Sequence, residues 1–145
     1  MICPSETEIE NFKEAVAKDW ITWHAFPFNT EPEIYDPDLI TFGIQLTHQL
    51  DDYFGKPRKT VFSQRDVPGM TRSIIPILKS NGVNFISVGS NGGSAPPNVP
   101  NAFIWEDPVS GERLRTFYLQ GGYGGINVLP GYRVPIVTGK QSDVA

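Results

Sequence analysis

The chain contains very little cysteine and no long apolar run. Its single cysteine, Cys3, cannot form a disulfide within the chain or supply a thiolate metal site by itself. No apolar stretch approaches the ~20 residues that cross a bilayer, and the opening MICPSETEIE lacks the basic and apolar regions of a signal peptide. We therefore expect a soluble protein without a membrane partner, and its compartment stays undetermined.

Positive charge is also scarce. Lysine and arginine total 12 against 16 aspartates and glutamates, so the net charge is −4. The basic residues are scattered along the chain instead of forming a stripe, so nucleic acid is not expected as a partner. A length of 145 residues suits one domain with one hydrophobic core.

Three helices are predicted from start and stop signals. Ser5 and Glu8 have capping-box spacing, which predicts a helix over about residues 6–18. The pair Asp36-Pro37 starts a second helix that stops at Gly55. The third follows Ser73 as its cap and ends at Asn81-Gly82.

Apolar runs between these helices predict strands at 20–26, 59–63 and 83–89. Strands that alternate with helices predict right-handed βαβ crossovers, so the three strands should be parallel. We therefore expect an α/β fold built on this βαβαβ segment. The expected parts are an amino-terminal helix (1–19), the βαβαβ core (20–89), a loop and β-hairpin (90–120) and an irregular tail (121–145).

Polar side chains cluster in the loops that follow the three predicted strands. The carboxyl ends of parallel strands meet at one edge of a sheet, where α/β folds place reactive groups. We therefore expect one site there, and its candidate residues are His24, Asn29, Glu31, Gln64, Arg65, Asp66, Arg72 and Asn91.

Asp66 is the central candidate, within QRDVPGMTR. It fits a turn acid that accepts backbone amides, and equally a nucleophile, a general acid or base, or a metal ligand. His24 fits either a satisfied, partly buried histidine or a ligand and proton donor. Two histidines and one cysteine without ligand spacing are weak evidence for a complete metal site.

Residues 19–125 resemble an uncharacterised family, domain of unknown function 5054, through QRDVPGMTR, PILKSNGVNFISVGSN and FIWEDPVSG. They are also similar, more distantly, to the amino-terminal barrel of family 38 glycoside hydrolases, the retaining α-mannosidases. That resemblance implies that the βαβαβ segment is part of a barrel of seven or eight strands, of the glycoside hydrolase/deacetylase type, because three parallel strands cannot close a barrel. It further implies that Asp66 is the catalytic nucleophile and a zinc ligand, in an enzyme that forms a covalent glycosyl intermediate.

Two departures from the mannosidase pattern shape the functional expectation. The sequence has VPGMT where mannosidases have Pro-Phe-Gly-His-Ser, and it contains no His-x-Asp zinc pair. We therefore expect a fragment of a larger barrel, inactive alone, that binds carbohydrate and the remainder of its parent barrel. A non-catalytic carbohydrate-binding or scaffold domain and a small complete α/β domain remain as alternatives.

Overall fold

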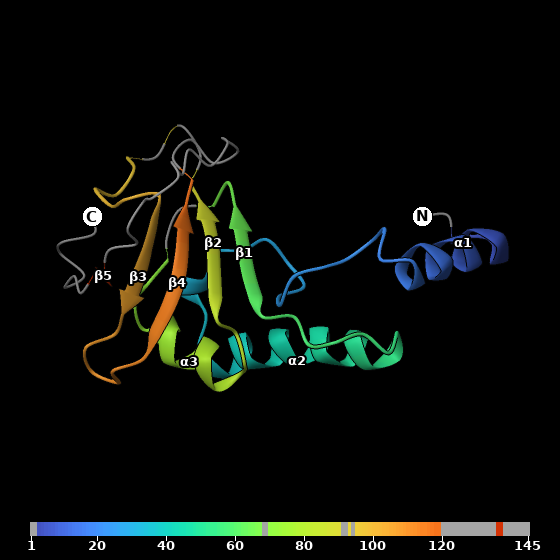
Figure 1. Ribbon diagram of the computed structural model, residues 1–145, viewed down its shortest axis with the longest axis horizontal. Helices are drawn as coiled ribbons and strands as arrows, with labels where there is room; N and C mark the ends of the chain where they lie inside the picture. The colour runs from blue at the N-terminus through green and yellow to red at the C-terminus, as the bar shows by residue number, and fades with distance from the viewer. Residues whose placement is uncertain (1–2, 68–69, 91–92, 94, 120–135, 138–145) are drawn as a thin grey trace.

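The computed structural model describes residues 3–67, 70–90, 93, 95–119 and 136–137. Its helices are α1 (Glu6–Ala17), the 3-10 helix η1 (Pro32–Ile34), α2 (Pro37–Tyr53) and α3 (Ile74–Ser80). Its strands are β1 (Val61–Arg65), β2 (Phe85–Gly89), β3 (Ala102–Glu106), β4 (Arg113–Tyr118) and β5 (Ile136–Val137). Figure 1 shows α2 and α3 below the strands and α1 set apart on the β1 side. None of the described helices is long and apolar enough to span a membrane.

The strands form one mixed sheet in the order β1-β2-β4-β3-β5. Neighbouring strands run parallel except β3 and β4, which are antiparallel. The register pairs Ser63 with Ser87 and Ser87 with Phe117, so these three side chains share one face. This mixed α/β arrangement with a mostly parallel sheet is consistent with part of an α/β barrel.

The hydrophobic core lies between one face of the sheet and helices α2 and α3. Phe62, Ile86 and Leu114 alternate with less buried neighbours along β1, β2 and β4, as expected for strands with one covered face. They pack with buried side chains of the two helices, among them Ile40, Ile44, Ile75 and Leu78. The opposite face, with Ser63, Ser87 and Phe117, is half-buried.

The predicted first and second helices are confirmed together with their caps. The Ser5 hydroxyl accepts the Glu8 amide and the Glu8 carboxylate accepts the Ser5 amide, as a capping box requires. Asp36 accepts the Leu39 amide at 2.8 Å at the start of α2. The third helix is also confirmed, but Ser73 makes no side-chain cap bond. Its first amide, that of Ile74, donates instead to the Thr71 carbonyl.

The predicted strand at residues 20–26 is wrong, because this segment is irregular. The amides of Trp20 and Ile21 both donate to the Ala15 carbonyl, so the segment begins as the end of α1. One backbone bond then joins it to β1, from the Ala25 amide to the Val61 carbonyl at 2.7 Å. Beyond it, Phe26 turns into the core against Phe62 instead of continuing a ladder.

The third parallel strand is β4 in place of the segment 20–26. The hairpin of β3 and β4 is confirmed, but its second strand also joins β2 in parallel, which the sequence pattern did not predict. The other two predicted strands are present as β1 and β2 with shifted bounds. The predicted irregular tail is wrong at β5, and the rest of it lies outside the described residues.

Candidate functional site

The residue after β1, Asp66, has a left-handed backbone with φ of 64°. Its amide still donates to the Gly89 carbonyl of β2 at 2.8 Å, so the hydrogen-bonded ladder extends one residue beyond β1. Non-glycine residues rarely adopt this conformation, although aspartate tolerates it better than most. Asp66 is exposed, so the structure presents its carboxylate at the edge where the parallel strands end. We call this edge the carboxyl edge.

Two side-chain amides fix the loop beside Asp66. Asn29 accepts the Arg65 amide at 2.8 Å and donates to the Arg65 carbonyl. Gln64, which is fully buried, donates to the Phe28 carbonyl at 2.9 Å and accepts the Thr30 amide at 2.6 Å. Both amides are therefore used to hold backbone, so they position the loop and the end of β1.

Arg65 reaches across the sheet to β2. Its guanidinium donates to the Gln64 carbonyl, to the Ser87 carbonyl at 2.7 Å and to the Ser87 hydroxyl at 2.6 Å. Burial lowers the pKa of Arg65, but a guanidinium stays protonated in proteins. Ser87 is not among the predicted site residues. It could have been found from the sequence, because it is a polar residue inside the otherwise apolar strand FISVG.

His24 is half-buried at the amino end of β1, where it lines a groove with Thr60 and Val61, so the structure places it at the edge opposite Asp66. Its Nδ1 accepts the Phe26 amide at 3.3 Å. Burial and, second, the positive charge of Arg65 lower the pKa of His24, so the imidazole is neutral at pH 7. A neutral histidine whose Nδ1 accepts a bond carries its proton on Nε2, which is the atom left for a ligand.

The other predicted residues are dispersed. Glu31 is partly buried and immediately precedes η1, where it makes no side-chain cap bond. Arg72 forms an ion pair with Asp107 at 3.3 Å, in the turn that precedes β4. Since β4 runs parallel to β1, this turn lies at the edge opposite Asp66, so the structure separates Arg72 from the carboxyl edge. Asn91 lies outside the described residues.

Two hydroxyl pairs also lie near the carboxyl edge, one where β2 and β4 end and one in the loop that contains Asn29. Ser90, the residue after β2, is buried and its hydroxyl accepts a bond from the Tyr118 hydroxyl at 3.2 Å. Thr30 donates its hydroxyl to the Tyr35 hydroxyl in the loop that holds Asn29. Thr30, Tyr35 and Tyr118 were not predicted, because their positions depend on how the loop and β4 pack.

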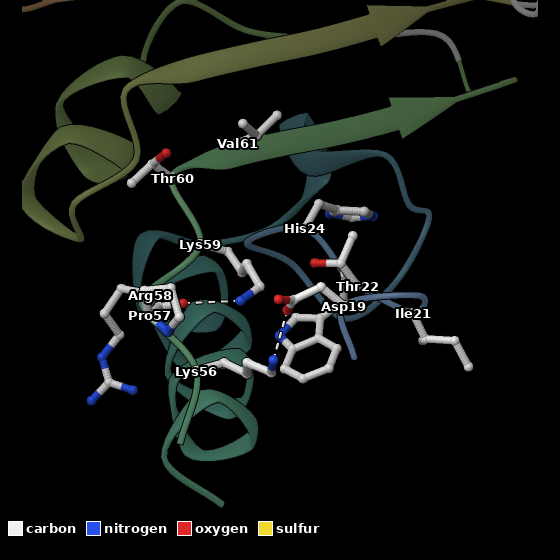
Figure 2. A pocket seen from close by; sticks show the side chains of 11 residues that line it. Asp19, Ile21, Thr22, His24, Lys56, Pro57, Arg58, Lys59, Thr60 and Val61 are labelled. Carbon is white, nitrogen blue, oxygen red and sulfur yellow. Dashed lines mark hydrogen bonds and ion pairs between the residues drawn. The ribbon is translucent and has the colours of Figure 1, made fainter. Parts of the chain in front are cut away.

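A groove of about 340 Å³ lies at the amino end of β1, which is the opposite edge. Figure 2 shows Lys56 and Lys59 pointing toward its centre, whereas Arg58 points away. Each cation has an acid: Lys56 pairs with Asp19 at 2.6 Å, and Lys59 and Arg58 pair with Asp51 and Asp52. The charges around the groove are therefore balanced. The Lys56–Asp19 pair joins the segment before β1 to a residue just after the end of α1, and the Lys59–Asp51 pair joins it to α2.

The described residues do not fit a zinc site. No three of their histidine, cysteine, aspartate or glutamate side chains come together as a metal-binding group. Catalytic zinc needs three protein ligands, and His24 already uses Nδ1 for a backbone amide.

Comparison with known proteins gives a fold likeness alone. No family model and no curated protein matches the sequence, so the resemblance to domain of unknown function 5054 is unsupported. Among solved structures, the chain is similar to the 4-α-glucanotransferase of Thermococcus litoralis, with a TM-score of 0.59 and 10% identity. The match covers 79% of this chain and 18% of that enzyme. The fold of this chain is thus shared with part of a much longer enzyme whose name states that it acts on glucan.

Proposed function

We propose that the chain is the part of a carbohydrate-active hydrolase-like α/β barrel that carries a catalytic carboxylate, Asp66. The observation that carries this proposal is the exposed, left-handed Asp66 directly after a parallel strand. Backbone strain of this kind clusters at functional sites, and reactive groups of α/β barrels lie at this end of the strands. The likeness to part of a glucanotransferase supports a carbohydrate substrate.

The proposed chemistry is that of a retaining glycosidase acting on α-mannosides or similar sugars. A carboxylate oxygen of Asp66 attacks the anomeric carbon while the bond to the leaving oxygen breaks, and a second carboxylic acid protonates that oxygen. Water then releases the sugar from Asp66, with the second residue acting as base. Glu31, Arg65 and Asn91 are the proposed sugar-binding residues, whereas Asn29 and Gln64 position the loop.

The chain alone is proposed to be inactive. A retaining site needs a second carboxyl group about 5 Å from the first, and the remainder of the parent barrel would supply it. Any zinc in the parent protein would likewise need ligands beyond the described residues. The share of the glucanotransferase that the chain covers supports a parent protein several times longer.

The test uses a longer protein that contains this chain, assayed across a panel of aryl glycosides with its zinc content measured. Asp66→Asn should lower kcat by at least about 1,000-fold, as the loss of a catalytic carboxylate does. Asp38→Asn, at an exposed acid in the first turn of α2, is the matched control and should leave kcat unchanged. The 145-residue chain itself should hydrolyse aryl α-mannosides at the background rate. Unchanged activity of Asp66→Asn would reduce Asp66 to a turn residue.

A second candidate is a non-catalytic carbohydrate-binding or scaffold domain. The observation that favours it is the use of both amides at the carboxyl edge, Asn29 and Gln64, for backbone bonds. On this alternative the longer protein binds glycans without cleaving them, and Asp66→Asn leaves the binding intact. Turnover of any glycoside that depends on Asp66 excludes it.

A further inference from the structure

A second apolar face runs along α2, turned away from the core. Its side chains, which we call the α2 stripe, are Leu39, Phe42, Leu46, Leu50 and Tyr53. Leu46 is half-buried, and the exposed fractions of the other four range from 40% for Leu50 to 72% for Tyr53. The face that packs on the sheet is a different one, centred on Ile40, Ile44 and Thr47. At 100° per residue the two faces lie about a third of a turn apart.

The flank of α2 opposite the stripe is occupied. Thr41, on that flank, accepts a bond from the Asn81 amide at the end of α3, and the two helices are in contact. The stripe instead continues toward α1, because Phe54 contacts both Tyr53 and Phe12 through its ring. Phe12 itself is 45% exposed. An apolar surface this long on a described helix indicates an interaction site.

The spacing of the stripe is symmetrical about its middle residue. Its members are separated by 3, 4, 4 and 3 positions, with Leu46 at the centre. A two-fold axis at Leu46 therefore places Leu39 opposite Tyr53 of another α2, and Phe42 opposite Leu50. The same surface on both partners, related by a two-fold axis, is what a symmetric dimer requires. We propose that the α2 stripe binds a second copy of this chain, with the two α2 helices antiparallel.

Charges at the two ends of the stripe favour the antiparallel direction. The amino end carries Asp36 and Asp38, whereas the charges around Tyr53 at the carboxyl end are balanced, because Lys13 pairs with Glu10 and Asp52 pairs with Arg58. An antiparallel pair brings the acids of one copy beside this balanced end of the other, and it also sets the two helix dipoles in opposite directions, which is the favourable arrangement for helices lying side by side. A parallel pair would set the four acids against one another. Exposed charges contribute little, so the apolar contact dominates.

The dimer is tested by sedimentation equilibrium of the purified chain at about 1–200 µM. We expect a monomer–dimer equilibrium, and Leu46→Lys should weaken it by about 100-fold or more, because it sets two like charges on the two-fold axis. Phe42→Lys, at a more exposed position, is the second variant and should weaken it in the same way. Val109→Lys is the control, since Val109 is an 88% exposed apolar residue far along the chain in the hairpin turn.

Cross-linking tests the register independently of affinity. In a Cys3→Ser background, Leu46→Cys should form a disulfide-linked dimer under mild oxidation, since residues on the axis face their own copies. Gln45→Cys, at an exposed position about 100° around α2 from Leu46, should not. A chain that stays monomeric throughout the concentration range overturns the proposal and assigns the stripe to another helix of a larger protein. A dimer that survives both lysine variants, or that cross-links equally through either cysteine, also overturns it.

Discussion

Asn29 and Gln64 hydrogen-bond to each other's flanking backbone. The Asn29 side chain accepts a hydrogen bond from the N–H of Arg65, the neighbour of Gln64, and donates one to the Arg65 carbonyl. The Gln64 side chain donates to the carbonyl of Phe28 and accepts the N–H of Thr30, and these two residues are the neighbours of Asn29. This exchange satisfies the outer edge of β1 with a side chain in place of a further strand, and it fixes the loop next to Asp66.

Gln64→Leu should therefore destabilise the chain by about 1–3 kcal/mol, because it leaves the partly buried Phe28 carbonyl and Thr30 N–H without their side-chain partner. Urea unfolding at pH 7 measures the loss. Gln45→Leu, at an exposed site on α2, is the matched control and should change stability by less than about 0.5 kcal/mol. A loss below about 1 kcal/mol for Gln64→Leu would show that water replaces the amide.

Gly43→Ala should destabilise the chain although alanine is the better helix former. A Cβ at Gly43 would lie 2.3 Å from Cε2 of the buried Phe26 ring, so the ring must move. Overpacking of this kind costs about 1–3 kcal/mol, which exceeds the gain in helix propensity of about 1 kcal/mol. Thermal unfolding gives the net effect. Adding Phe26→Leu should make Gly43→Ala neutral or stabilising, and a double variant no better than the sum of the single ones contradicts this packing.

The backbone of Asp66 predicts an order of stability among its substitutions. Glycine adopts a φ of 64° without steric cost, alanine does so at about 1 kcal/mol, and a β-branched residue costs more. Asp66→Gly should thus be more stable than Asp66→Ala, and Asp66→Val should be the least stable of the three. Since all three remove the carboxylate, differences in urea midpoint report the backbone alone. Equal midpoints would mean that the turn relaxes out of the left-handed region.

His24 should titrate below its ordinary pKa of 6.5, because burial and the charge of Arg65 both disfavour its protonation. Its contribution to stability is full above pH 6.5 and is lost as the pH falls through the lowered pKa, where the unfolded chain binds the proton first. NMR titration of the imidazole measures this pKa directly. Arg65→Gln should raise the pKa part of the way and keep it below 6.5, since burial is the larger cause.

Arg115→Gln is the control for that titration, because Arg115 is an exposed arginine on β4. It should leave the pKa of His24 unchanged. A wild-type His24 that titrates at or above 6.5 contradicts its burial, and one that does not respond to Arg65→Gln contradicts the effect of the Arg65 charge on its pKa.

Local signals were sufficient for the helices and the hairpin. The Ser5–Glu8 box and the Asp36-Pro37 pair mark where α1 and α2 start, and the left-handed Gly82 follows the end of α3. Each signal acts within a few residues of the helix end that it marks, so the sequence predicts these helix ends directly. The segment 20–26 has the aromatic and β-branched residues typical of a strand, but these side chains make separate tertiary contacts instead of lining a ladder. Trp23, for example, donates its indole N–H to the buried Asp51 at 2.8 Å, a partner 28 positions away.

The candidate site was predicted in part for the same reason. Asp66 follows β1 by chain order alone, so its place at the carboxyl edge could be predicted from the sequence. Arg72 is six positions further along the chain, yet it pairs with Asp107 at the opposite edge. Its location depends on the path that the chain takes between β1 and α3, and no local pattern encodes that path.

The sequence by itself determined the helix caps, the hairpin, the low positive charge and the acid after the first parallel strand. These features depend on residues near one another in the chain, through backbone hydrogen bonds and restricted φ angles. Tertiary structure decided that β4 joins β2, that side-chain amides cap the edge of β1 and that α2 keeps an exposed apolar stripe. Each of these depends on which distant surfaces bury one another, a balance that local propensity does not contain.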